Sequence, residues 1–127
     1  MPHLRLEYSG NIDIPENQLN LLFLHLHEVL VTRANADLLR CQSRAISCEN
    51  FCVGDGGKTR AFVYLQVLLL EGRTSSQLQE TGNELLKTLQ DRFKTLLLHY
   101  NAQISVHLNI IPADRSYKSN HYSEVET

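Results

Sequence analysis

The stretch that most constrains the fold is the apolar run from Ala61 to Leu70. Apolar side chains occupy both odd and even positions of this run, whereas a strand with one solvated face would alternate. The run is therefore predicted to be a β-strand that is covered on both faces of its sheet. Its longest uninterrupted apolar part, Val67 to Leu70, is far too short to cross a bilayer.

A first helix is predicted over about residues 15–33, and Asp13 and Glu16 have capping-box spacing at its start. Its apolar positions recur at intervals of three and four, as on one face of a helix. They are Leu19, Leu22, Phe23, Leu26 and Leu30. Leu21 and Leu24 lie outside this stripe, which indicates a second contact surface.

A second helix is predicted to follow the central strand, beginning at Thr74, which has capping-box spacing to Gln77. Its apolar stripe is Leu78, Leu85, Leu86, Leu89, Phe93, Leu96 and Leu97, with Gly82 as the small member. Asn101 is predicted to end this helix.

Three further strands are predicted. Leu4, Leu6 and Tyr8 alternate with polar residues, and residues 103–110 alternate in the same way before Pro112. Residues 43–53 are rich in β-branched and aromatic side chains and are predicted to be the remaining strand. The glycine-rich segment at residues 54–57 is predicted to be a hairpin turn that leads into the central strand.

The predicted elements form the same strand–helix–strand unit twice, over about residues 2–53 and 59–111. Each unit is a β-α-β motif, which requires parallel pairing and a right-handed crossover. The sequence thus predicts one α+β domain over residues 1–127, with a four-stranded mixed sheet and a polar C-terminal arm at 112–127. Two helices cover only one face of such a sheet, so an oligomer is expected to cover the other.

Composition narrows the classes of function. The net charge of −2 gives no electrostatic reason to expect nucleic acid or an anionic membrane as a partner. The first residues lack the basic and apolar regions of a signal peptide. Cys41, Cys48 and Cys52 are an odd number of cysteines without a secretory context, which favours reduced thiols and a cytoplasmic location.

Several short patterns do not support a metal or nucleotide site. His25 and His27 are two positions apart on a predicted helix, so their side chains point in different directions. Cys48 and Cys52 have no second cysteine pair to complete a zinc site. Residues 54–58 lack the full spacing of a phosphate loop and lead into a strand rather than a helix. No metal is therefore expected.

The N-terminus and the arginines are the candidates for chemistry. Methionine aminopeptidase removes Met before a small residue, so Pro2 is able to become a secondary amine at the head of the first strand. Arg73 stands where the central strand passes into the second helix, a place that favours anions. Arg40 and Arg44 flank the start of the strand at 43–53, and guanidinium groups bind carboxylates bidentately.

These residues lie within segments that resemble the 5-carboxymethyl-2-hydroxymuconate isomerase family of the tautomerase superfamily. The segments are Met1–Ile12, Ser43-Arg44, Ala61–Val63 and Glu71–Thr74. The similarity in spacing extends over essentially the whole chain. The opening Pro-His-x-x-x-Glu-Tyr-Ser and the Gly-Arg-Thr before the second helix are the most specific parts.

The resemblance implies a tautomerase-like double β-α-β fold assembled as a homotrimer, and a reaction that needs no cofactor or metal. It implies that Pro2, once Met1 is removed, is the general base that moves a proton within a small unsaturated hydroxy or keto acid. Arg73 matches the family arginine that holds a substrate carboxylate or polarises its carbonyl. Arg44 matches the second arginine of an Arg-Ser-Arg stretch.

One position departs from the family pattern. Gln42 stands where that stretch has its first arginine, and Arg40, two positions earlier, is a candidate substitute. Two functions therefore remain open. The chain is either an isomerase for a small carboxylate, or a trimeric ligand-binding protein that kept the fold and lost catalysis.

Overall fold

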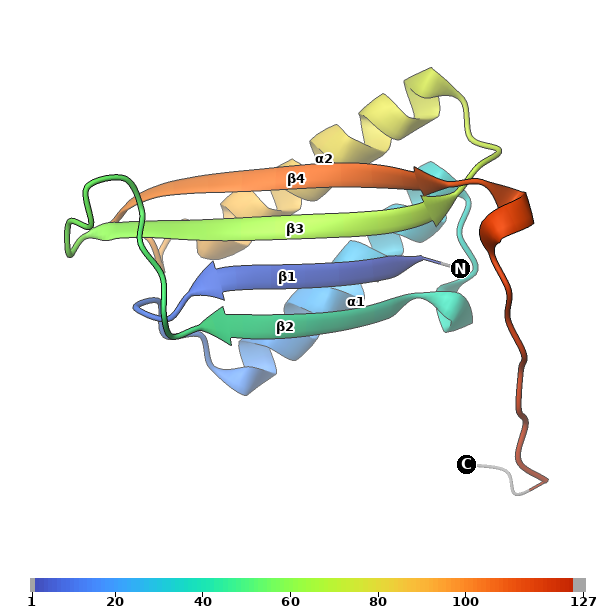
Figure 1. Ribbon diagram of the computed structural model, residues 1–127, viewed down its shortest axis with the longest axis horizontal. Coiled ribbons are helices and arrows are strands. Elements are labelled where there is room, and N and C mark those ends of the chain that lie inside the picture. Colours follow the sequence, from blue (N-terminus) through green and yellow to red (C-terminus); the bar gives the residue numbers. More distant parts are fainter. Residues whose placement is uncertain (1, 125–127) are drawn as a thin grey trace.

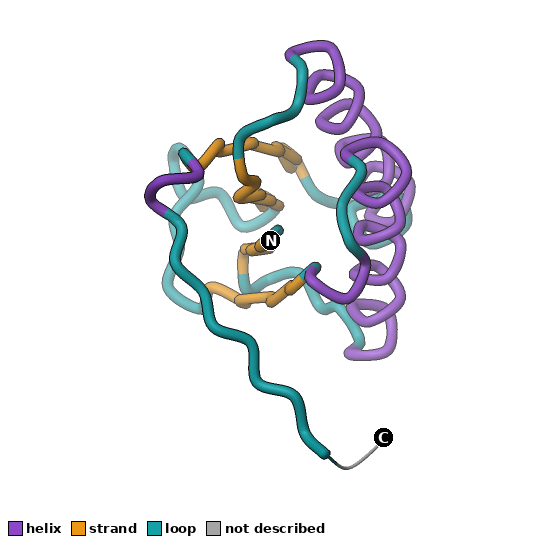
Figure 2. The backbone as a smooth tube through the Cα atoms, turned by 90° about the vertical axis from the view of Figure 1, so that its right-hand side faces the viewer, coloured by secondary structure: helices purple, strands orange, loops and turns teal. Residues whose placement is uncertain are grey.

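The computed structural model describes residues 2–124, which form a four-stranded sheet with two helices on one face (Figures 1 and 2). The strands and helices are β1 (His3–Ser9), α1 (Glu16–Ala34), β2 (Gln42–Cys48), β3 (Arg60–Leu70), α2 (Ser75–Phe93) and β4 (Asn101–Ile111). Short 3-10 turns, η1 (Leu38–Arg40) and η2 (Ala113–Arg115), precede β2 and follow β4.

The strand order is β2-β1-β3-β4. β1 pairs with β2 in parallel and β3 pairs with β4 in parallel, whereas β1 and β3 are antiparallel. Each half of the chain is thus a β-α-β unit, and the two units join along the central β1–β3 pair. The predicted α+β fold, with a mixed sheet and both helices on one face, is confirmed.

The two faces of β3 have different environments. Every second side chain, from Ala61 to Leu69, is at most 1% exposed and packs beneath the helices. The alternate side chains, Phe62, Tyr64, Gln66, Leu68 and Leu70, are half-buried on the opposite side, which we call the open face. The described residues provide no second layer over the open face (Figure 2).

Helix α1 buries the predicted stripe at Leu22, Leu26 and Leu30, together with Val29 and Ala34. The capping box predicted at Asp13 and Glu16 is wrong, because Pro15 is the N-cap and no side chain caps the helix. The helix ends at Ala34. The C-cap residue Asn35 has a left-handed φ of 53°, and its N–H donates to the Leu30 carbonyl.

Helix α2 begins as predicted, since the Thr74 hydroxyl accepts a hydrogen bond from the Gln77 N–H at 3.1 Å. It ends at Phe93, so Leu96 and Leu97 lie in the turn that follows, where they still pack against the core. Asn101 does not stop the helix. Asn101 is instead the first residue of β4. Its N–H donates to the Thr59 carbonyl at 2.8 Å, which joins the start of β4 to the start of β3.

The strand predicted at 43–53 begins one residue earlier in the structure and ends five residues earlier, at Cys48. Its partner β1 ends at Ser9, which pairs with Cys48, so no strand remains for later residues to pair with. Gly10 closes this junction by donating its N–H to the Cys48 carbonyl at 2.7 Å.

The hairpin predicted at residues 54–57 is also wrong. β2 and β3 are not neighbours, because β1 lies between them, and the segment 49–59 crosses the end of β1 as an extended loop (Figure 1). Arg60 holds this loop through hydrogen bonds to both carboxylate oxygens of Asp55, at 2.6 and 3.1 Å.

The C-terminal arm leaves the sheet at β4. A backbone hydrogen bond from Glu71 to Ile111 ties its start to the end of β3. From Ser116 to Glu124 the arm is exposed and runs away from the body of the molecule (Figure 2), and residues 125–127 lie outside the described part of the chain. Within the described residues, no helix has the length and apolar character needed to cross a membrane.

Candidate functional site

Three of the predicted site residues, Pro2, Gln42 and Arg73, lie at one end of the sheet, where β1 and β2 begin and β3 and β4 end (Figure 1). Pro2 precedes β1 and is buried. Its carbonyl accepts a hydrogen bond from the Gln42 N–H at 3.1 Å, so the start of β2 holds the start of β1. Pro2 is therefore fixed by the sheet rather than fraying. Met1 lies outside the described residues, so its removal stays a prediction.

Arg73 joins this end of the sheet to the helical layer. Its Nε donates to the Ala34 carbonyl at 2.6 Å, at the end of α1, and its Nη1 donates to the Leu70 carbonyl at 3.0 Å. A guanidinium has five N–H donors, so these two bonds leave the Nη2 edge available for another acceptor. An open depression of about 220 Å³ surrounds Arg73, Gly72, Asn35 and Gln77.

Arg44 lies on the open face of the sheet. Leu4 faces the helices and pairs with Ser43, so strand alternation places Arg44 and Gln42 on the other side. Arg44 Nη2 is 3.0 Å from His3 Nδ1. Burial, followed by the charge of Arg44, lowers the pKa of His3, which keeps the imidazole neutral and able to accept this hydrogen bond.

Arg40 is separate from both groups. It lies in the exposed turn η1, and its Nε is 3.4 Å from Asp37 Oδ2 in an i,i+3 ion pair. The structure thus brings Pro2, Arg73 and the backbone of Gln42 to one end of the sheet. Within one chain, it places Arg44 on the open face and pairs Arg40 with an acidic neighbour.

Two side chains near this end were not among the predicted site residues. Cys41 immediately precedes β2 beside Pro2 and packs against the hydrophobic core, and burial raises the pKa of its thiol. His3 contacts Arg44 across the β1–β2 pair. No local spacing in the sequence singles out either residue, because the parallel register that pairs His3 with Gln42 is set by contacts between residues distant in the chain.

The described residues contain no cluster of three or more histidine, cysteine, aspartate or glutamate side chains placed to hold a metal ion. His25 and His27 lie on α1. The Nε2 of His27 is 2.5 Å from the Ser43 hydroxyl, so this histidine links the helix to β2.

Two β-α-β units that join through an antiparallel central pair, with a proline at the head of the first strand, define a protein of the tautomerase fold. A sequence model described as 5-carboxymethyl-2-hydroxymuconate isomerase matches residues 2–125, and the chain belongs to this family. No match was found among curated protein sequences.

Solved structures agree with this family. A 5-carboxymethyl-2-hydroxymuconate isomerase from Deinococcus radiodurans R1 is 27% identical, with a TM-score of 0.83 over 94% of this chain and 90% of that one. A 5-carboxymethyl-2-hydroxymuconate delta-isomerase is 17% identical, with a TM-score of 0.78 over 96% and 89%. A fused 4-OT symmetric trimer, 17% identical, matches with a TM-score of 0.72 over 95% and 94%. Family and fold together support an enzyme of the isomerase or tautomerase type.

Proposed function

We propose that the chain is a cofactor-independent isomerase that moves a proton within a small unsaturated hydroxy or keto acid, similar to 5-carboxymethyl-2-hydroxymuconate. Pro2 is its general base after Met1 is removed. The observation that carries the proposal is the position of Pro2, buried at the head of β1 and held by β2 at the same sheet end as Arg73.

The proposed chemistry follows from this position. Burial and nearby guanidinium groups disfavour the charged ammonium form of a prolyl amine, so the free base persists near neutral pH. The amine takes a proton from the enol hydroxyl or from the carbon next to the carbonyl. The resulting prolinium then returns a proton to another carbon of the same conjugated system, so the substrate is neither oxidised nor reduced.

The free Nη2 edge of Arg73 is the proposed contact for the substrate carboxylate or its carbonyl oxygen. Arg44 faces the open side of the sheet, so we propose that it serves a site shared with a neighbouring subunit. A homotrimer that covers the open face would bring such a neighbour into contact. We also propose that the protein is cytoplasmic, because its odd number of cysteines without a secretory context favours reduced thiols.

The decisive experiment compares the wild type with Pro2→Ala. Alanine still permits Met1 removal and still supplies an amine, but a primary and conformationally free one. We expect kcat/KM for a hydroxymuconate or for enolic phenylpyruvate to fall by about 100-fold or more, because a positioned general base contributes about 10²–10⁴-fold. Intact mass confirms processing of both proteins, and circular dichroism confirms their fold. Unchanged turnover by processed Pro2→Ala would rule out Pro2 as the base.

A second candidate function is a trimeric ligand-binding protein that no longer catalyses. The observation that favours it is Gln42, which stands where the family pattern has an arginine, together with the engagement of Arg73 by two backbone carbonyls. Absence of turnover across a panel of enol acids, with the N-terminus confirmed as Pro2, would support this candidate. Efficient turnover of a hydroxymuconate diacid would dismiss it.

A further inference from the structure

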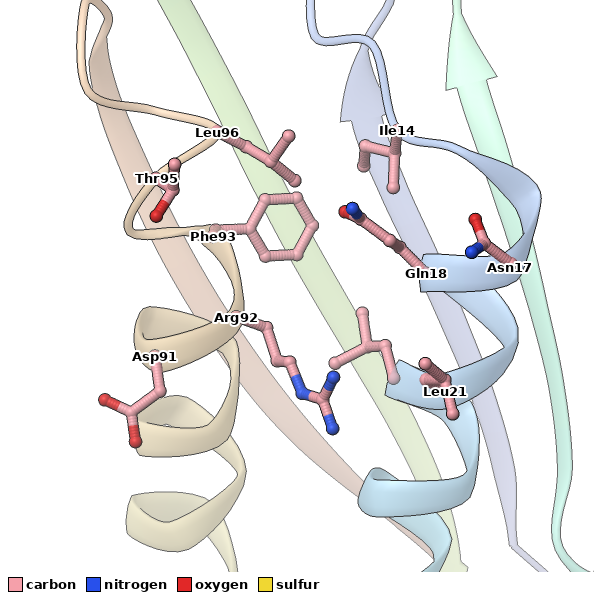
Figure 3. Close-up of a pocket in the computed structure, with 10 residues that line it drawn as sticks. Ile14, Asn17, Gln18, Leu21, Asp91, Arg92, Phe93, Thr95 and Leu96 are labelled. Atoms are coloured by element: carbon pink, nitrogen blue, oxygen red, sulfur yellow. The ribbon is translucent and has the colours of Figure 1, made fainter.

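A second cavity lies at the other end of the helical layer, between the start of α1 and the end of α2 (Figure 3). Its volume is about 570 Å³, within the range of cavities that hold small organic ligands. Ile14, Leu22, Phe93 and Leu96 supply an apolar wall, and the amide of Gln18 reaches between the helices toward Phe93.

This cavity is separate from the candidate site around Pro2. Its residues belong to the first turns of α1 and to the C-terminal end of α2, whereas Arg73 lies at the opposite ends of both helices. A helix of 19 residues spans about 28 Å, which is the approximate separation of the two regions. The sheet face that carries Arg44 is on the other side of the molecule.

Two charged residues line this cavity, Arg92 and Asp91. The guanidinium of Arg92 extends from α2 toward α1, whereas the carboxylate of the neighbouring Asp91 is turned away (Figure 3). Ion pairs within residues 2–124 engage Arg5, Arg33, Arg40 and Arg60 but not Arg92. The uncapped N-terminus of α1, with its partial positive charge, faces the same end.

We propose that this cavity binds a small amphipathic carboxylate, with its apolar body against Phe93, Leu22 and Leu96 and its carboxylate on Arg92. One unpaired guanidinium beside an apolar wall matches a single anionic group on a hydrophobic body. A polyanion such as a nucleotide would find only one cationic side chain there, and an amine would meet repulsion from it.

Octanoate is a suitable probe, compared with octylamine and octanol, which have the same chain and a different head group. Isothermal titration calorimetry and amide chemical shifts of the wild type are expected to show binding of octanoate, with shift changes at Ile14, Gln18 and Phe93. Octylamine is expected to bind at least 10-fold more weakly.

Arg92→Gln is expected to weaken octanoate binding at least 10-fold while leaving octanol binding unchanged, and Arg92→Lys to restore part of the difference. Lys87→Gln, which removes a positive charge from an exposed position of α2 outside the cavity, is the matched control and should bind octanoate as the wild type does. The proposal is overturned if octanoate does not bind. It is equally overturned if octanoate changes the amide chemical shifts of residues outside this cavity instead. Equal affinity of octanoate for Arg92→Gln and for the wild type would also overturn it. None of these outcomes depends on isomerase activity.

Discussion

Arg73 has a structural role that is visible before any substrate is considered. Its two backbone bonds connect the last turn of α1 to the last residue of β3, two elements that belong to different halves of the chain. Both acceptors are at element ends, where carbonyl groups lack a partner within their own helix or strand. The same side chain thus fixes the site and presents its remaining N–H groups there.

Arg73→Ala is therefore expected to lower the free energy of unfolding by about 1–3 kcal/mol, because it leaves two partly buried carbonyl groups without donors. Arg40→Ala removes an exposed ion pair and is expected to cost less than about 1 kcal/mol. Urea denaturation of the two variants checks the difference. Equal stability of both variants would contradict the structural role of Arg73.

The protonation of the His27 side chain is coupled to the packing of α1 on β2, because His27 contacts Ser43. Burial lowers the pKa of His27 below the 6.5 that is usual for histidine. The unfolded chain therefore takes up this proton at a higher pH than the folded one. The stabilisation that results is complete above about pH 6.5, and it is lost as the pH falls through the lowered folded pKa.

Replacing His27 by glutamine is expected to reduce the loss of stability between about pH 7.5 and about pH 5.5, because glutamine still bonds Ser43 but does not titrate in this window. Urea midpoints at the two pH values measure the effect. His121→Gln, in the exposed arm, should leave the pH dependence of the wild type intact. An identical pH dependence in His27→Gln and the wild type would show that His27 makes no contribution.

At the scale of elements, glycines mark where chain segments come close together. Gly82 lies inside α2, and a methyl group there would be 3.7 Å from Leu108 Cδ1 on β4, an ordinary contact distance. Gly10 follows β1, and a methyl group there would be 2.7 Å from the Cys48 carbonyl oxygen, which is backbone and unable to give way easily. The two positions therefore predict opposite outcomes for the same substitution.

Gly82→Ala is expected to stabilise the protein by about 0.5–1 kcal/mol, since alanine restricts the unfolded chain and favours the helix. Gly10→Ala is expected to destabilise it by about 1–3 kcal/mol by separating β1 from the end of β2. Thermal or urea unfolding distinguishes the two. A loss of stability in Gly82→Ala would mean that α2 and β4 pack more tightly at this point than the structure shows.

At the scale of the whole molecule, the open face of the sheet is the surface that the described residues of a single chain leave uncovered. Half-buried apolar side chains of β3 flank two polar pairs there, Tyr64 with His107 at 3.1 Å and Gln66 with Asn109 at 3.2 Å. A mixed surface of this kind resembles a protein interface, which combines apolar area with satisfied hydrogen bonds. This is the face that the proposed homotrimer would cover.

Sedimentation velocity is expected to give a mass three times the 14.5 kDa of the chain. Leu68→Arg places a charge in the centre of the open face and is expected to shift the protein to monomers. Leu24→Arg, on the outer side of α1 where Leu24 is 63% exposed, should leave the trimer intact. A wild type that sediments as a monomer at micromolar concentration would contradict the proposed assembly.

The sequence by itself determined the order and type of the elements, because apolar periodicity records which side chains face a core. Leu4 and Leu6, the stripe of α1 and the cap at Thr74 all follow from local spacing, and each has its predicted environment. The same spacing supplied Pro2 at the head of a strand. Periodicity does not encode how the two units join, however.

The tertiary structure alone decided the strand order, and with it the ends of β2 and the path of residues 49–59. It also decided the surroundings of the arginines. Arg73 bonds two carbonyl groups that are 39 and 3 positions away, and Arg44 meets a histidine 41 positions away. Such partners depend on the register between β1 and β2 and on how α1 packs, and both are set by contacts between residues distant in the chain.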